Sequence, residues 1–360
     1  MASSSTARAM AGSEAFRTRL LCTPDEVRAG LPALEAFQDS LGGVHLWQRP
    51  AWVRCRPLDT FWLALTEDGA GWVRAASLWR VRRLPAGLGW TARADRGPVA
   101  VDTDALAVHL DQLEDLWPRG LIQYRVSPML EREAAAPVAA VLAARGLRPE
   151  LKDPGVYAAT IVLDLEPAPD ALRAGFRRSL KTQLNKGRRA GVEVARTAEP
   201  AAVEAFVALH DAMAARRGLA PLGTAMQSAL PRLLAGARSP LTLFIARHGG
   251  EVVAGILLVA AGDRIIYEWG ATSEAPAHRS LPLSHMLHWE AIQWARSAGF
   301  RWYDFGGYWE DRGDSDPINR FKTGFSKTVQ RLLPEHVRVR RPLVAGVLRT
   351  AVALHRLARR

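Results

Sequence analysis

The sequence has 360 residues, too many for one typical hydrophobic core, so we expect two domains. A hydrophobic fraction of 48% excludes general disorder, and two cysteines, Cys22 and Cys55, exclude a disulfide framework. The formal net charge of +12 favours an anionic partner, which would be RNA, a phosphorylated small molecule or an anionic membrane surface. No apolar run has the length of a membrane span, and the N-terminus has no apolar core of signal-peptide length, so we expect a soluble cytoplasmic protein.

The first half of the sequence predicts an α+β domain behind a loose N-terminus. We expect a flexible tail over residues 1–30 and the first domain over residues 31–155. Apolar runs between turn residues predict strands, and apolar residues at helical spacing predict helices. In chain order the expected elements are strands over 61–65 and 71–81, a helix over 104–117, a strand over 121–126 and a short helix over 136–144.

The second half repeats this order. The expected elements are strands over 241–247, 252–260 and 265–269, a helix over 283–298 that ends at Gly299, and a strand over 300–305. In both halves, a meander of strands precedes a helix, a glycine and one further strand. Two copies of one α+β unit explain this order most simply. We place the second copy over residues 156–320.

A strongly basic stretch lies between the two halves. Residues 170–191 are expected to form one helix, with Asp170 at its start and apolar residues facing inward. After Asp170 the stretch contains seven cations and no acid, although like charges four residues apart repel. We therefore expect it to bind an anion, in particular a nucleic-acid backbone; a solvated helix face is the simpler alternative. The cations assigned to this role are Arg177, Arg178, Lys181, Lys186, Arg188 and Arg189.

The segment after the strand expected over 300–305 ends in an unusual arrangement. Two glycines release the chain into a polar loop, which closes at Lys322 between Phe321 and Phe325. A fixed cation of this kind is a candidate for stabilising the oxyanion of an acyl-transfer reaction. The alternative is an ordinary loop lysine in a surface ion pair with Asp314 or Asp316.

These features resemble the FemABX family, whose members transfer an amino acid from aminoacyl-tRNA to the peptide of a cell-wall precursor. The resemblance covers roughly residues 34–335 and rests on five short motifs in the right order. They are Gln48-Arg49-Pro50-Ala51-Trp52 with Arg56, Arg96-Gly97-Pro98-Val99, the basic stretch ending at Gly191-Val192-Glu193-Val194, Tyr303-Asp304-Phe305-Gly306-Gly307, and Phe321-Lys322-Thr323-Gly324-Phe325. The chain departs from the family's pattern at Gly187, where alanine is usual, and at Ser326, where glycine often follows the final phenylalanine.

The resemblance implies a fold and its boundaries. FemABX proteins contain two tandem domains like those of the GCN5-related acetyltransferases (GNATs). Each domain is α+β, with a mixed, mainly antiparallel sheet flanked by helices. The last segment, which we place over residues 321–340, is expected to return to the first domain. This fold agrees with the internal repeat.

The resemblance also implies roles for individual residues. Lys322, with Phe321 packed beside it, matches the lysine proposed to act in catalysis in the family. The residues expected to bind the substrate are Arg56, Arg216, Arg96 and Trp52; of these, Arg56 and Arg216 match positions that hold the phosphates of the acceptor. From the residues alone, Arg216 is equally suited to be a solvent-facing cation near the end of a helix over 201–217. Arg96 is equally suited to be a structural turn residue.

The predicted function is transfer of an amino acid from aminoacyl-tRNA to the amine of a peptidoglycan precursor stem peptide. Aminoacyl-tRNA would be the donor substrate, a lipid-linked or nucleotide-linked muropeptide the acceptor, and no cofactor or metal is expected. One alternative is tRNA-dependent aminoacylation of a small-molecule natural product. Another is an acyl-CoA-dependent N-acyltransferase of the same fold, but Pro282 stands at the first glycine of the expected pyrophosphate loop and has no N–H to donate. A third is an RNA- or membrane-binding adaptor without activity.

The C-terminal residues predict a basic amphipathic helix. We place this helix over residues 341–360, and we expect residues 343–360 to contact an anionic membrane surface. The alternatives for this segment are packing against the protein and binding RNA. We therefore expect a cytoplasmic monomer that is peripheral on the inner face of the cell membrane.

Overall fold

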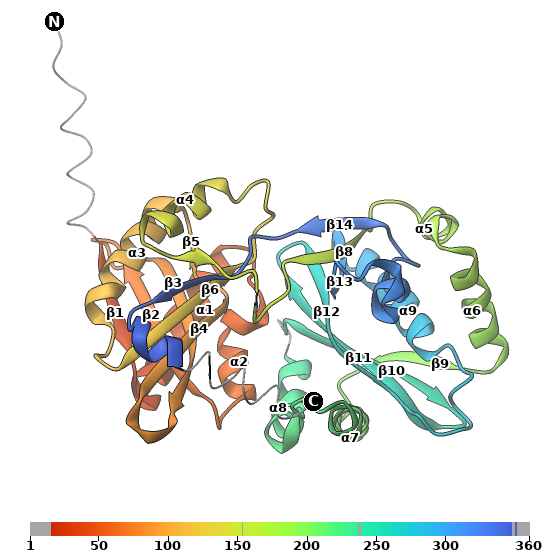
Figure 1. Cartoon of the computed structure of the whole chain (residues 1–360). Helices are drawn as coiled ribbons and strands as arrows, with labels where there is room; N and C mark the ends of the chain where they lie inside the picture. Colours follow the sequence, from red (N-terminus) through yellow and green to blue (C-terminus); the bar gives the residue numbers. More distant parts are fainter. Residues whose placement is uncertain (1–15, 153, 237–238, 348–349, 351–360) are drawn as a thin grey trace, which may run out of the picture. The chain divides into compact units, whose positions relative to one another are not determined.

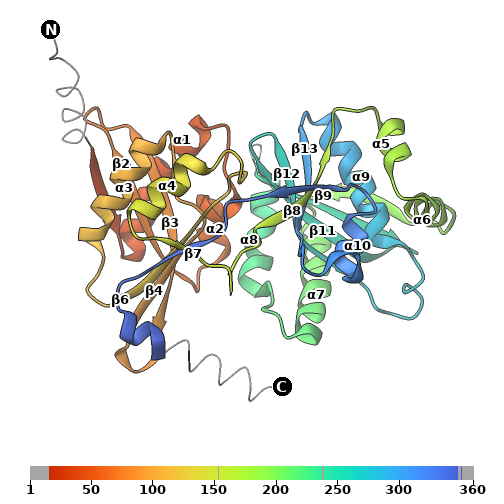
Figure 2. The ribbon, with the colours of Figure 1, turned by 45° about the horizontal axis from the view of Figure 1, so that its top comes forward.

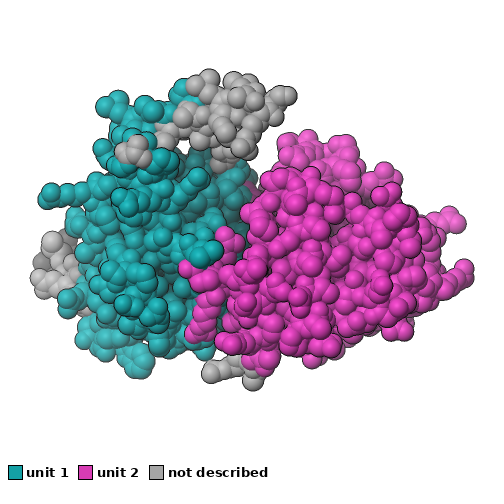
Figure 3. All heavy atoms as spheres, turned by 90° about the horizontal axis from the view of Figure 1, so that it is seen from below, with its two compact units in different colours: residues 1–53, 58–156, 332–360 teal, residues 54–57, 157–331 magenta. Residues whose placement is uncertain are grey.

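The computed structural model describes residues 16–152, 154–236, 239–347 and 350. The chain divides into two compact units, shown in two colours in Figure 3. The first unit comprises residues 1–53, 58–156 and 332–360, and the second comprises residues 54–57 and 157–331. Each unit contains its own sheet and its own hydrophobic core.

The sheet of the first unit has the strand order β1-β2-β3-β4-β6-β15-β7, with β5 beside β3 (Figure 1). All neighbouring strands are antiparallel except β4 and β6, which are parallel. The strands are β1 (Arg17–Leu21), β2 (Thr60–Glu67), β3 (Val73–Leu84), β4 (Gly89–Arg96), β5 (Val99–Ala100), β6 (Leu121–Pro128), β7 (Arg148–Pro149) and β15 (His336–Val339).

Helices cover both faces of this sheet. They are α1 (Pro24–Ser40), α2 (Pro50–Cys55), α3 (Thr103–Leu116) and α4 (Ala136–Ala144), with 3₁₀ turns η1 (Leu46–Gln48) and η2 (Pro85–Gly87). Because side chains alternate along a strand, β2 can serve two cores. Leu63 lies against Gly30 of α1, whereas Trp62 and Ala64 join the cluster formed by Leu106 and other residues of α3.

The prediction of a flexible tail over residues 1–30 is wrong from residue 16 onward, and residues 1–15 lie outside the described part. β1 pairs with β2 from Arg17↔Glu67 to Leu21↔Leu63. A capping box then starts α1, because the Thr23 hydroxyl accepts from the Glu26 N–H while the Glu26 carboxylate accepts from the Thr23 N–H at 2.9 Å. Burial of the apolar face of α1 fixes this segment on the sheet.

A buried carboxylate holds the returning C-terminal segment in the first unit. Glu335 is 1% exposed and accepts from the guanidinium groups of Arg93 on β4 and Arg125 on β6, each at 2.7 Å. Its second oxygen also accepts from the Gly155 N–H at 3.0 Å. One side chain therefore connects the segment before β15 to two other strands and to the end of the preceding part of the unit.

The sheet of the second unit has the order β14-β8-β13-β12-β11-β10-β9. Its neighbours are antiparallel except β12 and β13, which are parallel over Arg264–Ile266 and Trp302–Asp304. The strands are β8 (Ala159–Asp164), β9 (Glu193–Thr197), β10 (Leu241–His248), β11 (Glu251–Ala261), β12 (Arg264–Thr272), β13 (Trp302–Gly307) and β14 (Thr328–Arg331). The helices are α5 (Pro169–Gly175), α6 (Arg178–Arg189), α7 (Pro200–Arg217), α8 (Gly223–Ala235), α9 (Leu283–Ser297) and α10 (Pro317–Lys322), with the 3₁₀ turn η3 (Gly313–Ser315).

The predicted repeat is confirmed. In the first unit, the meander β2-β3-β4 leads through α3 to β6, which is parallel to β4. In the second, the meander β10-β11-β12 leads through α9 to β13, which is parallel to β12. Each unit is thus α+β with a mixed, mainly antiparallel sheet flanked by helices, as predicted for tandem GNAT-like domains (Figures 1 and 2).

The prediction of one basic helix over residues 170–191 is wrong, because this stretch forms two helices. Phe176 and Arg177 are extended between α5 and α6, with ψ angles of 148° and 140°. Phe176 packs edge-on against Trp289 and Phe325, and the Arg177 N–H donates to Gly324 O at 2.9 Å. These tertiary contacts outweigh the helical propensity of the stretch. Asp170 lies in the first turn of α5 but does not cap it.

Two further boundaries differ from the prediction. The return to the first unit begins at residue 332 rather than 321, because β14 pairs with β8 in the second unit. Lys322 ends helix α10 and does not lie in a loop. Of the C-terminal helix predicted over residues 341–360, residues 342–347 are helical, whereas 348, 349 and 351–360 lie outside the described residues. None of the described helices is long and apolar enough to cross a bilayer.

Candidate functional site

Lys322 lies in the interior of the second unit. Its side chain is 5% exposed, and its ammonium donates to Gly307 O, at the end of β13, at 2.5 Å. The alternative of a surface ion pair with Asp314 or Asp316 is wrong. Asp314 pairs with Arg177 at 3.0 Å, and Asp316 accepts from the N–H groups of Ile318 and Asn319 as the N-cap of α10.

Helix α10 is held in place by buried polar groups. Asn319, fully buried, donates from its amide to Trp309 O at 2.7 Å and to Gly313 O at 2.9 Å. Its amide oxygen accepts from the Trp309 N–H at 3.3 Å. The polar loop after β13 therefore closes back on α10, which places Lys322 beside the strand end. A side chain fixed in this way loses little entropy when it stabilises a charge.

Asp304 on β13 supplies the nearest buried negative charge. It accepts from Arg264 at 2.9 Å, from the Gly306 N–H at 2.8 Å and from the Thr160 hydroxyl. These donors satisfy the carboxylate of Asp304 in a fully buried position. Its hydrogen bond to Gly306, where φ is 70°, also shapes the turn that presents Gly307 O to Lys322.

A cluster of aromatic rings includes Phe321, the residue before the lysine. Phe321 contacts His285 at 5.0 Å and His288 at 5.3 Å between ring centroids, and His288 Nδ1 forms a 2.8 Å hydrogen bond with the Tyr303 hydroxyl. Burial, with the Lys322 charge as a second cause, lowers the pKa of His288 to about 3. Burial lowers the pKa of His285 to about 4. Both histidines are therefore neutral at pH 7.

The same burial acts on the lysine itself. It lowers the pKa of Lys322 from 10.5 to about 8, although the carboxylates of Asp304 and Asp316 act in the opposite direction. At pH 7 the ammonium form still predominates. The site thus holds a buried positive charge, and a buried charge interacts more strongly than it does in water.

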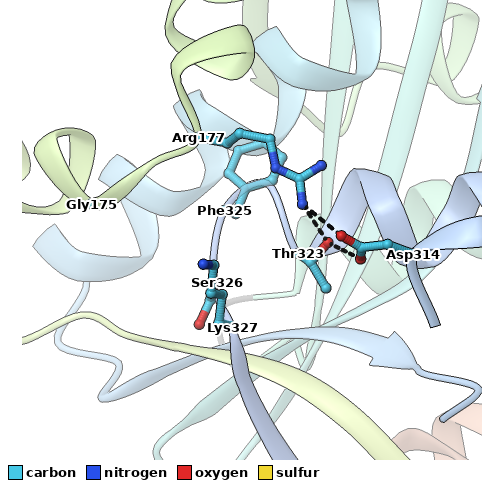
Figure 4. Close-up of a pocket in the computed structure, with 7 residues that line it drawn as sticks. All are labelled: Gly175, Arg177, Asp314, Thr323, Phe325, Ser326 and Lys327. Atoms are coloured by element: carbon cyan, nitrogen blue, oxygen red, sulfur yellow. Dashed lines mark hydrogen bonds and ion pairs between the residues drawn. The ribbon is translucent and has the colours of Figure 1, made fainter.

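Two pockets of the second unit are lined by the residues next to Lys322 in the sequence, one by Thr323 and the other by Phe321. The pocket in Figure 4 has a volume of about 540 Å³ and is lined by Thr323 and Phe325, among others. Arg177 crosses it and donates to Asp314 at 3.0 Å and to the Thr323 hydroxyl at 3.1 Å. Arg177 was predicted to bind RNA, but its contacts show that it supports the chain on both sides of Lys322.

The second pocket lies at the start of α9 and has a volume of about 470 Å³. Phe321 and His285 line it, together with Lys186 from α6 and the loop that precedes α9. Lys186 donates to Ser280 O at 2.6 Å, so this cation, also predicted to bind RNA, fixes that loop. Gly187 allows α6 to approach α9 closely, since a Cβ there would lie 2.6 Å from the Met286 side chain.

The other predicted RNA-binding residues differ in their surroundings. Lys181 is half-buried and donates to Ala174 O at 2.8 Å. Arg178, Arg188 and Arg189 are exposed on α6 and form no ion pair with any residue that the structure describes. The apolar side of the helix, Leu180 and Leu184, is buried in the core. These three arginines therefore form the exposed cationic face of α6.

Arg216 lies in the last turn of α7, where it pairs with Glu274 at 2.9 Å. Glu274 also lines the pocket at the start of α9. Both partners are about half exposed, so this ion pair is accessible to a competing anion. The structure thus places Arg216 near the pocket that Phe321 lines.

The predicted motifs of the first unit meet each other. The Gln48 side chain binds Leu78 and Asp95 through their backbones and contacts Gly97 so closely that a Cβ there would lie 2.4 Å away. Arg96 is buried, has a φ of 60°, and places its guanidinium 5.9 Å from the Trp47 ring.

Trp52 is buried and contacts Trp47 at 6.1 Å between ring centroids. Arg56 is half-buried in the stretch 54–57, which belongs to the second unit. Arg96 and Trp52 therefore have packing roles in the first unit, whatever they bind.

Sequence reasoning missed the supporting residues Asp304, Asn319 and Arg264. Asp304 stands inside a motif that the resemblance quoted, but nothing in the sequence indicates its buried donors. Asn319 and Arg264 belong to no motif. Their partners lie up to 40 residues away along the chain, as for Arg264 and Asp304, so only the fold brings them together.

Comparisons with known proteins agree with this architecture. The family model described as acetyltransferase (GNAT) domain matches residues 174–323, which lie in the second unit. No curated protein matches the sequence. The crystal structure of FemX is similar, with a TM-score of 0.73 and 15% identity over 91% of this chain and 99% of FemX.

Two further solved structures are also similar. One is the C-terminal domain of a putative lysylphosphatidylglycerol synthetase from Agrobacterium fabrum, with a TM-score of 0.56 and 14% identity over 91% of this chain and 97% of that one. The other is L-PGS from Bacillus licheniformis, with a TM-score of 0.56 and 15% identity over 90% and 96% of the two chains. At these identities, the likeness shows the fold. The chain therefore has the fold of two tandem GNAT-like units, and its second unit contains the region that matches the acetyltransferase (GNAT) domain model.

Proposed function

We propose that the protein is a tRNA-dependent aminoacyltransferase that adds an amino acid to the stem peptide of a peptidoglycan precursor. The observation that carries the proposal is the buried ammonium of Lys322, fixed beside the end of β13. An aminoacyl ester is already activated, and the acceptor supplies the nucleophile. The protein then needs to position the two substrates and to stabilise the oxyanion.

The proposed reaction needs no covalent enzyme intermediate. The acceptor amine attacks the ester carbonyl carbon and forms a C–N bond, and the carbonyl oxygen becomes an oxyanion. Lys322 has three N–H donors, of which one binds Gly307 O, so others can point to this oxygen. Collapse of the intermediate breaks the C–O bond to the ribose, and the proton released by the amine passes to the ribose oxygen. Phe321 and Arg177 act as positioning residues.

The cationic face of α6 suits the donor. Arg178, Arg188 and Arg189 can neutralise phosphates of the tRNA without breaking a contact within the described protein. Arg177, Lys181 and Lys186 hold backbone carbonyls or an acid of their own unit, so we assign them to positioning. Arg216, with Arg56, would receive the acceptor phosphates by exchange with Glu274. Because charged tRNA is made in the cytoplasm, we place the protein there.

The loop before α9 argues against acyl-CoA as the donor. In that loop the His278 N–H donates to Ala275 O at 2.8 Å and the Leu281 N–H donates to His278 O at 3.0 Å. Pro282, the N-cap of α9, has no N–H at all. Two N–H groups of the loop are thus used within the loop, and Pro282 removes the donor at the expected first glycine, which supports aminoacyl-tRNA over CoA.

The test is a transfer assay with the full-length protein. It uses a mixture of radiolabelled aminoacyl-tRNAs with lipid-linked precursor, nucleotide-linked precursor or phosphatidylglycerol as the acceptor, and acetyl-CoA as a competing donor. We expect ribonuclease-sensitive transfer of label to a precursor, and the labelled amino acid then identifies the donor. Acetyl transfer without tRNA-dependent transfer would reject the proposal, and transfer to phosphatidylglycerol alone would change the acceptor class.

The α6 face predicts a measurable loss of RNA affinity. Replacing Arg178, Arg188 and Arg189 by glutamine should remove about three phosphate contacts, and the slope of log K against log salt should fall by about two to three units. Fluorescence anisotropy with labelled tRNA measures this slope. The matched control replaces Arg173 by glutamine; it lies on α5 and donates to the Asn185 side chain, so it should change the slope by less than one unit. An equal slope in the triple variant and wild type would contradict the assignment.

A further inference from the structure

Three turns meet at one end of the sheet of the first unit. The turn between β3 and β4 lies beside the turn between α3 and β6, since the Trp90 N–H donates to Gly120 O at 2.9 Å. The chain that enters the helical turn over 342–347 reaches the same place, where the Arg341 guanidinium donates to Leu88 O at 3.3 Å. Figure 2 shows this last helical turn beside the β3–β4 hairpin.

Large apolar side chains are exposed on these three turns. Leu88 is 39% exposed, Leu116 is 42%, Leu343 is 87% and Val347 is 65%. Ala345, on the other side of the last turn, is buried, so this turn is anchored to the unit while its leucine points outward. Burying such side chains in protein would be favourable, and their exposure at three neighbouring tips calls for a partner.

Exposed arginines lie close to these apolar residues in the sequence. Arg82, Arg83, Arg119 and Arg341 are exposed, and none of them forms an ion pair within the described ranges. The acid of the neighbouring helix end, Glu114, is already paired with Arg338 and Arg340 at 3.3 and 3.5 Å. Asp115 is an exposed acid beside them. The local charge is therefore positive.

We propose that this face, formed by Leu88, Leu116, Leu343 and Val347 with Arg82, Arg83, Arg119 and Arg341, binds an anionic lipid bilayer. Apolar side chains at the tips enter the boundary between headgroups and acyl chains, and the arginines bind lipid phosphates. The contact is peripheral. It differs from contact through the C-terminal residues alone, because two of the three turns precede residue 121.

The chemistry favours a bilayer over RNA or a protein. RNA would use the arginines but would leave the exposed leucines in water. A protein interface typically has a contiguous apolar centre with charges at its rim, whereas here arginines separate apolar tips that come from three turns. A bilayer accepts both kinds of side chain at every point of its surface.

The test measures flotation of the full-length protein with vesicles and needs no catalytic activity, so it is independent of the proposed function. We expect binding to phosphatidylcholine vesicles that contain about 30 mol% phosphatidylglycerol, and much weaker binding to phosphatidylcholine alone. Replacing Arg82, Arg83 and Arg119 by glutamine should lower the partition coefficient roughly a hundredfold, because each arginine contributes about a factor of five. Replacing Leu88 and Leu343 by serine should lower it several-fold with the charge unchanged.

The matched control is the Arg178→Gln, Arg188→Gln, Arg189→Gln variant, which removes the same charge from the second unit. It should bind vesicles like the wild type. Equal loss in both triple variants would show that net charge alone drives binding, and this would overturn the proposal. Binding at the wild-type level by the Arg82, Arg83, Arg119 variant would also overturn it, by assigning the contact to other residues. Loss of tRNA binding in that variant, with vesicle binding retained, would make the face an RNA site.

Discussion

Replacing Lys322 by methionine should lower the rate of amino-acid transfer by about two to three orders of magnitude while the fold stays intact. Methionine is similar in length and unbranched, and it removes a buried charge together with the hydrogen bond to Gly307 O. The rate should fall because the oxyanion loses its fixed cation. Single-turnover transfer from purified aminoacyl-tRNA measures this loss, and circular dichroism checks the fold. The matched control is Lys152→Met, an exposed lysine of the first unit, which should transfer at the wild-type rate.

The pH dependence separates two roles for this lysine. Because burial lowers the pKa of Lys322 to about 8, the ammonium is lost as the pH rises through that value. The ratio of the wild-type rate to the Lys322→Met rate should therefore be constant below pH 8 and should fall above it. This ratio cancels the titration of the acceptor amine, which both proteins share. A ratio that rises up to pH 8 and then levels off would contradict oxyanion stabilisation, because a neutral lysine would then act as a general base.

Replacing Glu335 by alanine should lower the free energy of unfolding of the first unit by about 3 kcal/mol or more. The substitution leaves the guanidinium groups of Arg93 and Arg125 without the carboxylate that both contact at 2.7 Å. It also leaves the Gly155 N–H without its acceptor. Urea unfolding followed by tryptophan fluorescence measures the change; both units contain tryptophans, and the transition of the first unit is the one that should shift.

The control for this experiment is Glu166→Ala, which breaks the ion pair of Arg301 and Glu166 at 2.6 Å on the surface of the second unit. Glu166 is 71% exposed, so this substitution should cost less than about 1 kcal/mol. If the two substitutions had equal effects, the buried carboxylate would not hold the C-terminal segment. Limited proteolysis near residues 332–340 should also become faster in the Glu335 variant alone.

The periodicity of the sequence was enough to predict the repeat and the helix that precedes β13. The helix expected over 283–298 is α9, because its apolar residues at helical spacing all face one core. The three strands of the second meander and the first two of the first meander were also predicted, since apolar runs between turns leave few other conformations. Strand β4 (Gly89–Arg96) was not predicted, because it lies in a passage rich in glycine and proline. The N-terminal strand β1 was not predicted, because three of its five residues are Arg17, Thr18 and Arg19 and because β2 alone supplies its partner.

The candidate site was only partly predictable. Lys322 was identified from its motif, but its burial was not, because lysines are almost always exposed and its acceptor Gly307 lies 15 residues away. The basic stretch was predicted to be one cationic helix. In the structure, Arg177 binds Asp314 of its own unit, whereas Arg178, Arg188 and Arg189 are exposed. Local sequence reports charge and periodicity. Which cation is used for support and which for binding depends on contacts made only in the folded chain.

The position of β15 has a consequence for synthesis of the protein. β6 is complete once residue 128 has left the ribosome, but its neighbour β15 ends at residue 339, roughly two hundred residues later. At a synthesis rate of 5–20 residues per second, the edge of β6 stays unpaired for about 10 to 40 s and can pair with other strands during that time. β7 pairs with β15 alone, so it also cannot join the sheet until β15 has been synthesised. The N-terminal part of the chain therefore finishes folding after the middle part, and a nascent chain truncated before residue 332 would carry an unprotected strand edge for its lifetime.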